Sequence, residues 1–230
     1  MREDELLGEV RALRARGLSP KAIARTLRLR PAAVAPLVRR VAQEASTAPP
    51  APGRVVGCWV SPGWSRGLIV ERREGWEDID LGPDGPQGVA VVIVARADRH
   101  DRVTVCGWLV DTFCLGVKNA IGPAAMRGRD LPQFVRTYFM AFPAGGLGAP
   151  IALAHELVLG AVEYAAGLGL SPAPAFAPTR AHLGELTDPR AITFGREGRP
   201  LYVPGPYDDS IEIMRTLESS VGSGGFAVAA

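Results

Sequence analysis

The sequence predicts an α+β protein: a small all-α head with a helix-turn-helix layout, then a larger domain with an antiparallel sheet and packed helices. Three observations lead to this fold class. Apolar residues in 1–44 recur only at helical spacing. Residues 45–53 are an Ala/Pro-rich linker that cannot join a helix or a central strand. Residues 54–230 open with Val/Ile-rich runs typical of strands and continue with helical periods.

Three stretches of the head have the apolar spacing of helices. Gly17 suits the end of the first helix, Ser19 and Pro20 suit the start of the second, and Pro31 suits the start of the third. We expect the three helices to pack around their shared apolar positions. These are Leu7, Val10, Ile23, Ala24, Leu27, Val34 and Leu37.

The net charge of +2 is distributed unevenly along the chain. Residues 1–45 hold ten basic and five acidic side chains, a charge of +5, whereas residues 46–230 carry −3. A basic head suits a polyanionic partner, so we expect it to contact the backbone of DNA or RNA. The arginines expected to contact phosphates are Arg25, Arg28, Arg30, Arg39 and Arg40.

The third helix of the head opens with residues that have no side-chain donors or acceptors. Pro31, Ala32, Ala33, Ala35 and Pro36 occupy these positions. Direct reading of bases requires such groups, so contacts are expected to be to phosphates. The alternative is that the head docks on a protein partner or on a second copy of the chain, as a homodimer.

The stretch Gly17–Val34 resembles the tri-helical head of resolvases and sigma-like regulators. In that family the small residue after the isoleucine, here Ala24, lets two helices approach closely. Taken over the whole tri-helical head, the resemblance covers about a fifth of the chain. It implies a helix-turn-helix fold and a role in nucleic-acid binding.

The sequence predicts strands in the first half of the body. Val55–Val60 and Leu68–Glu71 are short candidates, and Val89–Arg96 and Val103–Val110 are Val/Ile-rich runs joined by a polar loop. The two longer runs are expected to pair as a hairpin and to form the centre of an antiparallel sheet.

Helices are expected over Leu131–Phe142 and Ile151–Leu168, with the second buried against the sheet. Ala191–Phe194 and Leu201–Val203 flank Gly195–Gly198 and suggest a second hairpin. Asp208 or Asp209 is expected to cap a last helix that runs to about Val221, followed by a loose tail.

Between Cys58 and Phe226 the body resembles an uncharacterised bacterial protein family. The segments that carry this resemblance are Gly107–Lys118, Ala154–Ala165, Gly205–Asp209 and Leu217–Gly222. The resemblance implies no activity.

Composition excludes several classes. The sequence has no apolar run of the roughly 18 to 20 uncharged residues that a membrane span needs, and its start lacks the apolar region of a secretory signal. A cytoplasmic protein with no membrane partner is expected. Cys58, Cys106 and Cys114 lack C-x-x-C spacing, so neither a disulfide framework nor a multi-cysteine zinc site is expected.

Four carboxylates are candidates for a metal site. Asp111 ends a predicted buried strand, Glu156 and Glu163 are seven residues apart on a predicted helix, and Asp208 is a further candidate. Such a cluster would hold Mg²⁺ or Mn²⁺ for phosphodiester hydrolysis. The alternative is structural: the aspartates cap a turn and a helix, and the glutamates form a solvated stripe.

A second candidate chemistry is thiol catalysis. Cys114 paired with His155 would have an activated thiol, and Lys118 follows one turn later. The alternative is that Cys114 is a small buried apolar residue, because it lies between Phe113 and Leu115.

The function expected from the sequence is that of a nucleic-acid-associated regulatory or accessory protein whose body binds a ligand or a partner. One alternative is a metal-dependent phosphodiesterase or nuclease that uses Asp111, Glu156 and Glu163. Another is a protein-interaction module that contacts no nucleic acid.

Overall fold

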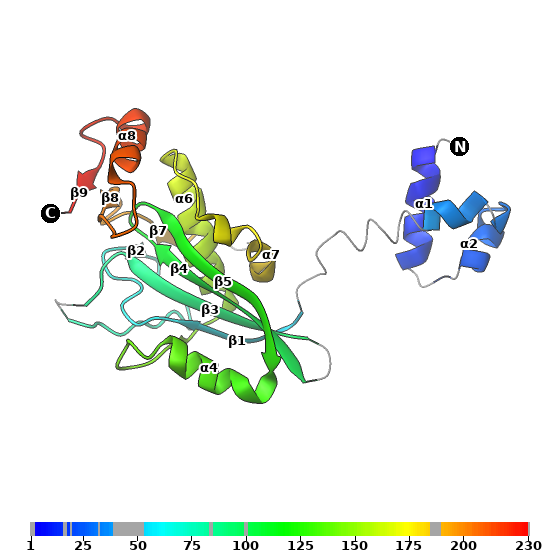
Figure 1. Cartoon of the computed structure of the whole chain (residues 1–230), viewed down its shortest axis with the longest axis horizontal. Helices are drawn as coiled ribbons and strands as arrows, with labels where there is room; N and C mark the ends of the chain where they lie inside the picture. The colour runs from blue at the N-terminus through cyan, green and yellow to red at the C-terminus, as the bar shows by residue number, and fades with distance from the viewer. Residues whose placement is uncertain are drawn as a thin grey trace. The chain divides into compact units, whose positions relative to one another are not determined.

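The computed structural model divides the chain into two compact units, Met1–Ala51 and Pro52–Ala230. Figure 1 shows the elements of both units. Among the described residues, no helix has the length and apolar character needed to cross a membrane. The structure describes residues 3–15, 18, 20–31, 33–38, 53–82, 85–98, 101–184 and 190–229.

The head is helical throughout its described elements. Helix α1 spans Glu3–Ala15, α2 spans Pro20–Thr26, and residues 33–38 are also helical. Val10, Ile23 and Val34 are completely buried at the centre of one apolar cluster. The predicted packing is confirmed, with Leu27 only partly buried at the margin of the cluster. The proposed cap positions 17 and 19 lie outside the described residues.

The body is built on a five-stranded antiparallel sheet in the order β5-β4-β3-β1-β6. The two predicted central strands are confirmed as neighbours inside this sheet, with Ile93 opposite Gly107. The bounds are β1 Val55–Val60, β3 Val89–Ala97, β4 Arg102–Asp111, β5 Gly116–Arg127 and β6 Leu147–Gly148.

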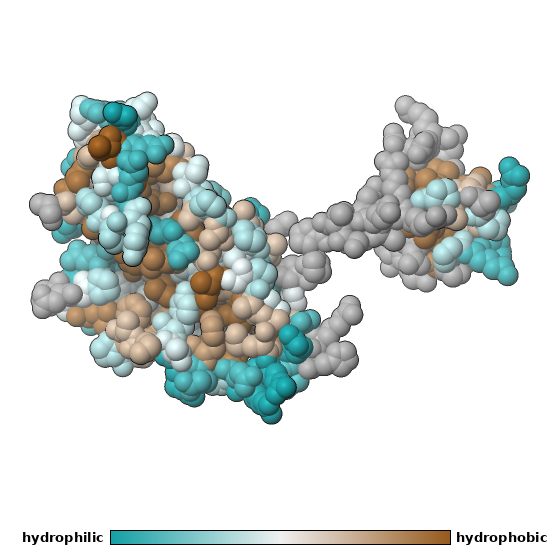
Figure 2. All heavy atoms as spheres, in the orientation of Figure 1, coloured by the Kyte–Doolittle hydropathy of each residue, from teal (hydrophilic) through white to brown (hydrophobic). Residues whose placement is uncertain are grey.

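Helices cover both faces of this sheet, which explains why the central strands are apolar at nearly every position. On one face, Val94 and Trp108 pack against Leu153 and Leu157. On the other face lies α4 (Leu131–Tyr138), preceded by the 3₁₀ turn η1 (Gly128–Asp130). The outward side of α4 forms the hydrophilic lower margin of the body in Figure 2.

The predicted helix over residues 151–168 is confirmed, but it contains a widened turn. It consists of α5 (Ile151–His155), the π-helical turn η2 (Glu156–Gly160) and α6 (Ala161–Gly167). A π turn has i→i+5 hydrogen bonds and rotates the chain less per residue than an α-helix. This changes which residues share a face. Glu156 is completely buried, whereas the side chain of Glu163 is 67% exposed.

The C-terminal third contains short elements that pair across the chain. Strand β7 (Ile192–Thr193) pairs with β2 (Ile69–Val70), and β8 (Leu201–Tyr202) pairs in parallel with β9 (Ala227–Val228). The predicted hairpin of residues 191–203 is therefore wrong: each strand has a distant partner, and only a single bridge, Arg196 to Arg199, joins the two sides of the turn.

The last predicted helix is confirmed as α8 (Ser210–Val221). Asp209 is its N-cap, and its side chain accepts a hydrogen bond from the Glu212 amide. Two further short helices, η3 (Pro174–Phe176) and α7 (Arg180–Leu183), lie between α6 and β7 along the chain.

Candidate functional site

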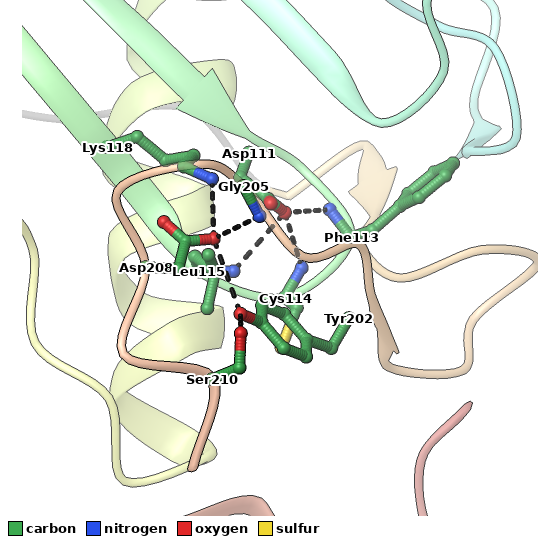
Figure 3. Close-up of polar contacts among 9 residues, drawn as sticks. All are labelled: Asp111, Phe113, Cys114, Leu115, Lys118, Tyr202, Gly205, Asp208 and Ser210. Carbon is green, nitrogen blue, oxygen red and sulfur yellow. Dashed lines mark hydrogen bonds and ion pairs between the residues drawn. The ribbon is translucent and has the colours of Figure 1, made fainter. Parts of the chain in front are cut away.

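The turn between β4 and β5 is organised by Asp111, the last residue of β4. Its Oδ1 accepts hydrogen bonds from the backbone amides of Phe113 (3.0 Å), Cys114 (2.8 Å) and Leu115 (3.2 Å). Figure 3 shows these three amides converging on one oxygen. One carboxylate oxygen thus satisfies three donors of a buried turn. Asp111 caps this turn, as the structural alternative of the sequence analysis stated.

Burial and hydrogen bonding act in opposite directions on this carboxyl group. Burial raises the pKa of Asp111, while the three backbone donors and the positive charge of Lys118 act to lower it. Gly116 then starts β5 with a φ of +69°, and a Cβ there would lie 3.0 Å from the Ala161 carbonyl oxygen. Glycine therefore suits both the backbone conformation and the close approach of the helix.

A second polar group lies beside this turn. Lys118 Nζ on β5 donates to Asp208 Oδ2 at 2.9 Å, and the Gly205 amide donates to the same oxygen at 2.8 Å. The side chains of Lys118 and Asp208 are 22% and 11% exposed. The Tyr202 hydroxyl lies 2.8 Å from the Ser210 hydroxyl and 3.5 Å from Asp208 Oδ2. This network ties β5 to the segment that precedes α8 (Figure 3).

Cys114 lies between the two polar groups but is packed among apolar side chains. It is completely buried in a cluster with Leu168, Tyr202 and Leu217. Burial, and then the charge of Asp111, raise the pKa of this thiol to about 12, against a smaller opposite effect of Lys118. A thiol with such a pKa is protonated at neutral pH and is not an activated nucleophile.

The predicted pair of Cys114 and His155 does not form. His155 is on α5, and its ring Nε2 lies 2.6 Å from the carbonyl oxygen of Leu183. A carbonyl only accepts, so this nitrogen carries the proton and holds the end of α7. The prediction of a thiol–imidazole site is wrong, because His155 contacts Leu183 and Cys114 packs in its apolar cluster, with no contact between the two in the described part of the chain.

Glu156 and Glu163 share a partner that the sequence analysis did not identify. Arg190 forms a hydrogen-bonded ion pair with Glu163, and its second terminal nitrogen lies 3.7 Å from Glu156 Oε1. Glu156 Oε2 accepts from the Ala191 amide at 3.2 Å. These glutamates therefore hold the start of β7 against the long helix.

The predicted metal cluster is not assembled. Asp111 binds its own turn, Glu156 and Glu163 bind Arg190, and Asp208 binds Lys118. Across the described ranges of the chain, no group of three His, Cys, Asp or Glu residues is placed to hold a metal ion. The prediction of a Mg²⁺ or Mn²⁺ site at these four residues is corrected on this ground, since each carboxylate already has a protein donor.

A small pocket opens next to the Lys118–Asp208 pair. It has a volume of about 170 Å³ and lies between the start of β5, the segment after α6, and α8. Sequence reasoning singled out Lys118 and Asp208 separately but missed Tyr202 and Ser210. The segment 205–209 contained the only signal, since it combines a Gly-Pro turn with two aspartates.

Three of the five arginines that are expected to contact phosphates lie in the described part of the head. Arg25, Arg28 and Arg30 are exposed, as is Lys21, one helical turn before Arg25. None of these four side chains forms an ion pair within the described part of the chain. Arg39 and Arg40 lie outside the described residues.

Comparisons with protein-family models, with curated proteins and with solved structures find no match to this chain.

Proposed function

We propose that this chain is a nucleic-acid-associated regulatory or accessory protein whose head holds the phosphate backbone and whose body binds a ligand. The observation that carries the proposal is a group of exposed cations on α2 and in the turn after it: Lys21, Arg25, Arg28 and Arg30. Lys21 and Arg25 are four residues apart on the helix and share a face. Arg28 and Arg30 follow in the turn before the next helix.

The contacts proposed for the head are electrostatic. In the next helical stretch, the exposed positions include Ala33 and Pro36, which offer no side-chain donors or acceptors to base edges. Arginine and lysine side chains neutralise phosphates regardless of sequence. We therefore expect binding that is sensitive to salt and tolerant of sequence.

The test is fluorescence anisotropy with labelled duplex DNA and with RNA. Affinity should fall steeply between about 50 and 200 mM salt, because bound phosphates release counterions. The triple variant Arg25→Ala, Arg28→Ala, Arg30→Ala should lose most of the affinity for every sequence alike, and the salt dependence should become shallower by about three contacts.

A matched control removes the same charge from the body. Arg102, Arg129 and Arg215 are exposed there, and their replacement by alanine should leave nucleic-acid affinity unchanged. Failure of the full chain to bind DNA or RNA at low salt would contradict the proposal and favour the protein-interaction module. A sharp base preference would contradict its electrostatic character.

A further inference from the structure

The pocket beside Lys118 and Asp208 has charges of both signs at its wall. Lys118 comes from β5, and Asp208 from the segment before α8. Their side chains are mostly buried but still reach the pocket surface, at 22% and 11% exposure. Charges that are partly removed from water interact more strongly with a ligand than charges at an open surface.

Among the described residues, the partners of Lys118 and Asp208 do not use all of their hydrogen-bonding capacity. A lysine ammonium has three N–H donors, and Lys118 uses one of them on Asp208 Oδ2. All hydrogen bonds to Asp208 from described residues go to Oδ2, which leaves Oδ1 as an acceptor. In Figure 3 the second carboxylate oxygen points away from Gly205 and Tyr202. Two N–H donors of Lys118 and the Oδ1 acceptor of Asp208 therefore remain for a ligand.

Most of the other residues at the wall are apolar. Ser171 is the one further polar residue that the described part of the chain places at the pocket. The apolar members are Leu115, Val117, Leu170, Ala173 and Ile213. An apolar wall with a few converging polar groups is the usual composition of a small-molecule site.

We infer that this pocket binds an α-amino acid with a small apolar side chain. Its carboxylate meets the free donors of Lys118, its ammonium meets Asp208, and its side chain covers the apolar wall. The chemistry follows from the two signs of charge: the spare N–H donors of Lys118 suit an anionic group, and Oδ1 of Asp208 suits a cationic group, so a zwitterion can contact both. The volume of about 170 Å³ equals that of about five or six water molecules, which restricts the ligand to a small molecule.

This inference rests on the part of the proposed function that gives the body a ligand, and it names that ligand. The site belongs to the body alone, so binding at the pocket and binding of nucleic acid by the head are measured separately. Failure of the valine titration therefore leaves the nucleic-acid proposal for the head intact, and the reverse also holds.

The test is calorimetric titration of the full chain with L-valine, isobutylamine and 3-methylbutanoate. Isobutylamine lacks the carboxylate of valine, and 3-methylbutanoate lacks its ammonium group. Valine should bind. Each single-charge analogue should have an affinity at least about tenfold lower, because one charged hydrogen bond is lost. Absence of binding by L-valine, L-alanine and L-leucine would overturn the inference. So would an analogue that binds as tightly as valine.

Variants locate the binding to this pocket. Ala173→Leu fills the cavity without touching the ion pair, and Asp208→Asn removes the charge that meets the ammonium. Both should weaken valine binding by about tenfold or more. Arg127→Gln, at the exposed far end of β5, is the matched control and should bind as the parent does.

Circular dichroism and thermal unfolding establish that each variant is folded before titration. Ala173→Leu keeps the Lys118–Asp208 contact, so it reports on the cavity even where Asp208→Asn destabilises the fold. Unchanged valine affinity in a folded Ala173→Leu variant would place the ligand elsewhere and overturn the assignment.

Discussion

Asp111 and Glu156 are the two buried carboxylates in the described part of the body, and their surroundings differ. Asp111 accepts three hydrogen bonds from amides two to four residues further along the chain. Glu156 accepts one, from Ala191 at a sequence separation of 35 residues, and its other oxygen has only the distant Arg190 charge. The first group is satisfied locally, and the second depends on tertiary packing.

Asp111 therefore has three hydrogen-bond donors that offset part of the cost of its burial, whereas Glu156 has few. A buried acid with three donors organises its turn, and removal of that acid leaves all three donors unsatisfied. A buried acid with one donor and a longer ion pair contributes little net stability, yet removal of its cation leaves a buried charge. Three experiments test this contrast. All four tryptophans lie between residues 59 and 108, so their fluorescence reports on the body alone.

The largest effect is expected for Asp111→Ala. Three amides of a buried turn lose their acceptor, so the free energy of unfolding should fall by about 4 kcal/mol. Urea titration followed by tryptophan fluorescence measures the change. Glu163→Ala, which removes an exposed carboxylate from α6, is the control and should cost less than about 1 kcal/mol. Equal losses in the two variants would refute the structural role of Asp111.

The next effect is expected for Arg190→Ala. This variant leaves Glu156 buried without a cation and should lower the free energy of unfolding by about 2 kcal/mol, less than for a fully buried pair because Arg190 is partly exposed. Adding Glu156→Gln should restore most of the loss, since glutamine keeps an acceptor for the Ala191 amide without the charge. A double variant as unstable as Arg190→Ala would show that the arginine acts by packing.

The smallest effect concerns the pH dependence of Asp111. Burial raises its folded pKa, so the folded state binds the proton more tightly than the unfolded state. The stabilisation from this group is complete below the ordinary aspartate pKa of about 4 and is lost as the pH rises through the folded pKa. Asp111→Asn lacks this titration.

The parent should therefore lose stability relative to Asp111→Asn as the pH increases across that interval. Urea titrations of both proteins at a series of acidic and neutral pH values measure the difference. A difference that changes in the opposite direction would mean that the backbone donors and Lys118 outweigh burial.

Sequence alone predicted the elements whose signals are local. The runs at 89–96 and 103–110 are strands because Val and Ile favour a pleated surface buried on both faces. Asp209 predicts the start of α8 because a side-chain oxygen can satisfy a free helix amide three residues on. The apolar spacing of the head likewise predicts its core.

Tertiary structure decided the remaining features. Strand β5 was missed because Gly122, Pro123 and several polar residues break its pattern, and only its pairing with β4 makes it a strand. The strands β7 and β8 were predicted to pair with each other, but they pair with β2 and β9, because strand pairing depends on contacts between distant segments.

The candidate site shows the same division. The residue types at Asp111, Cys114, Lys118 and Asp208 were identified from the sequence, but their partners were not. Glu156 is buried and Glu163 is exposed, and Arg190 reaches both from a segment 27 to 34 residues further along the chain. A carboxylate becomes a cap, an ion-pair partner or a ligand group according to the nearest donor, and folding alone brings that donor into place.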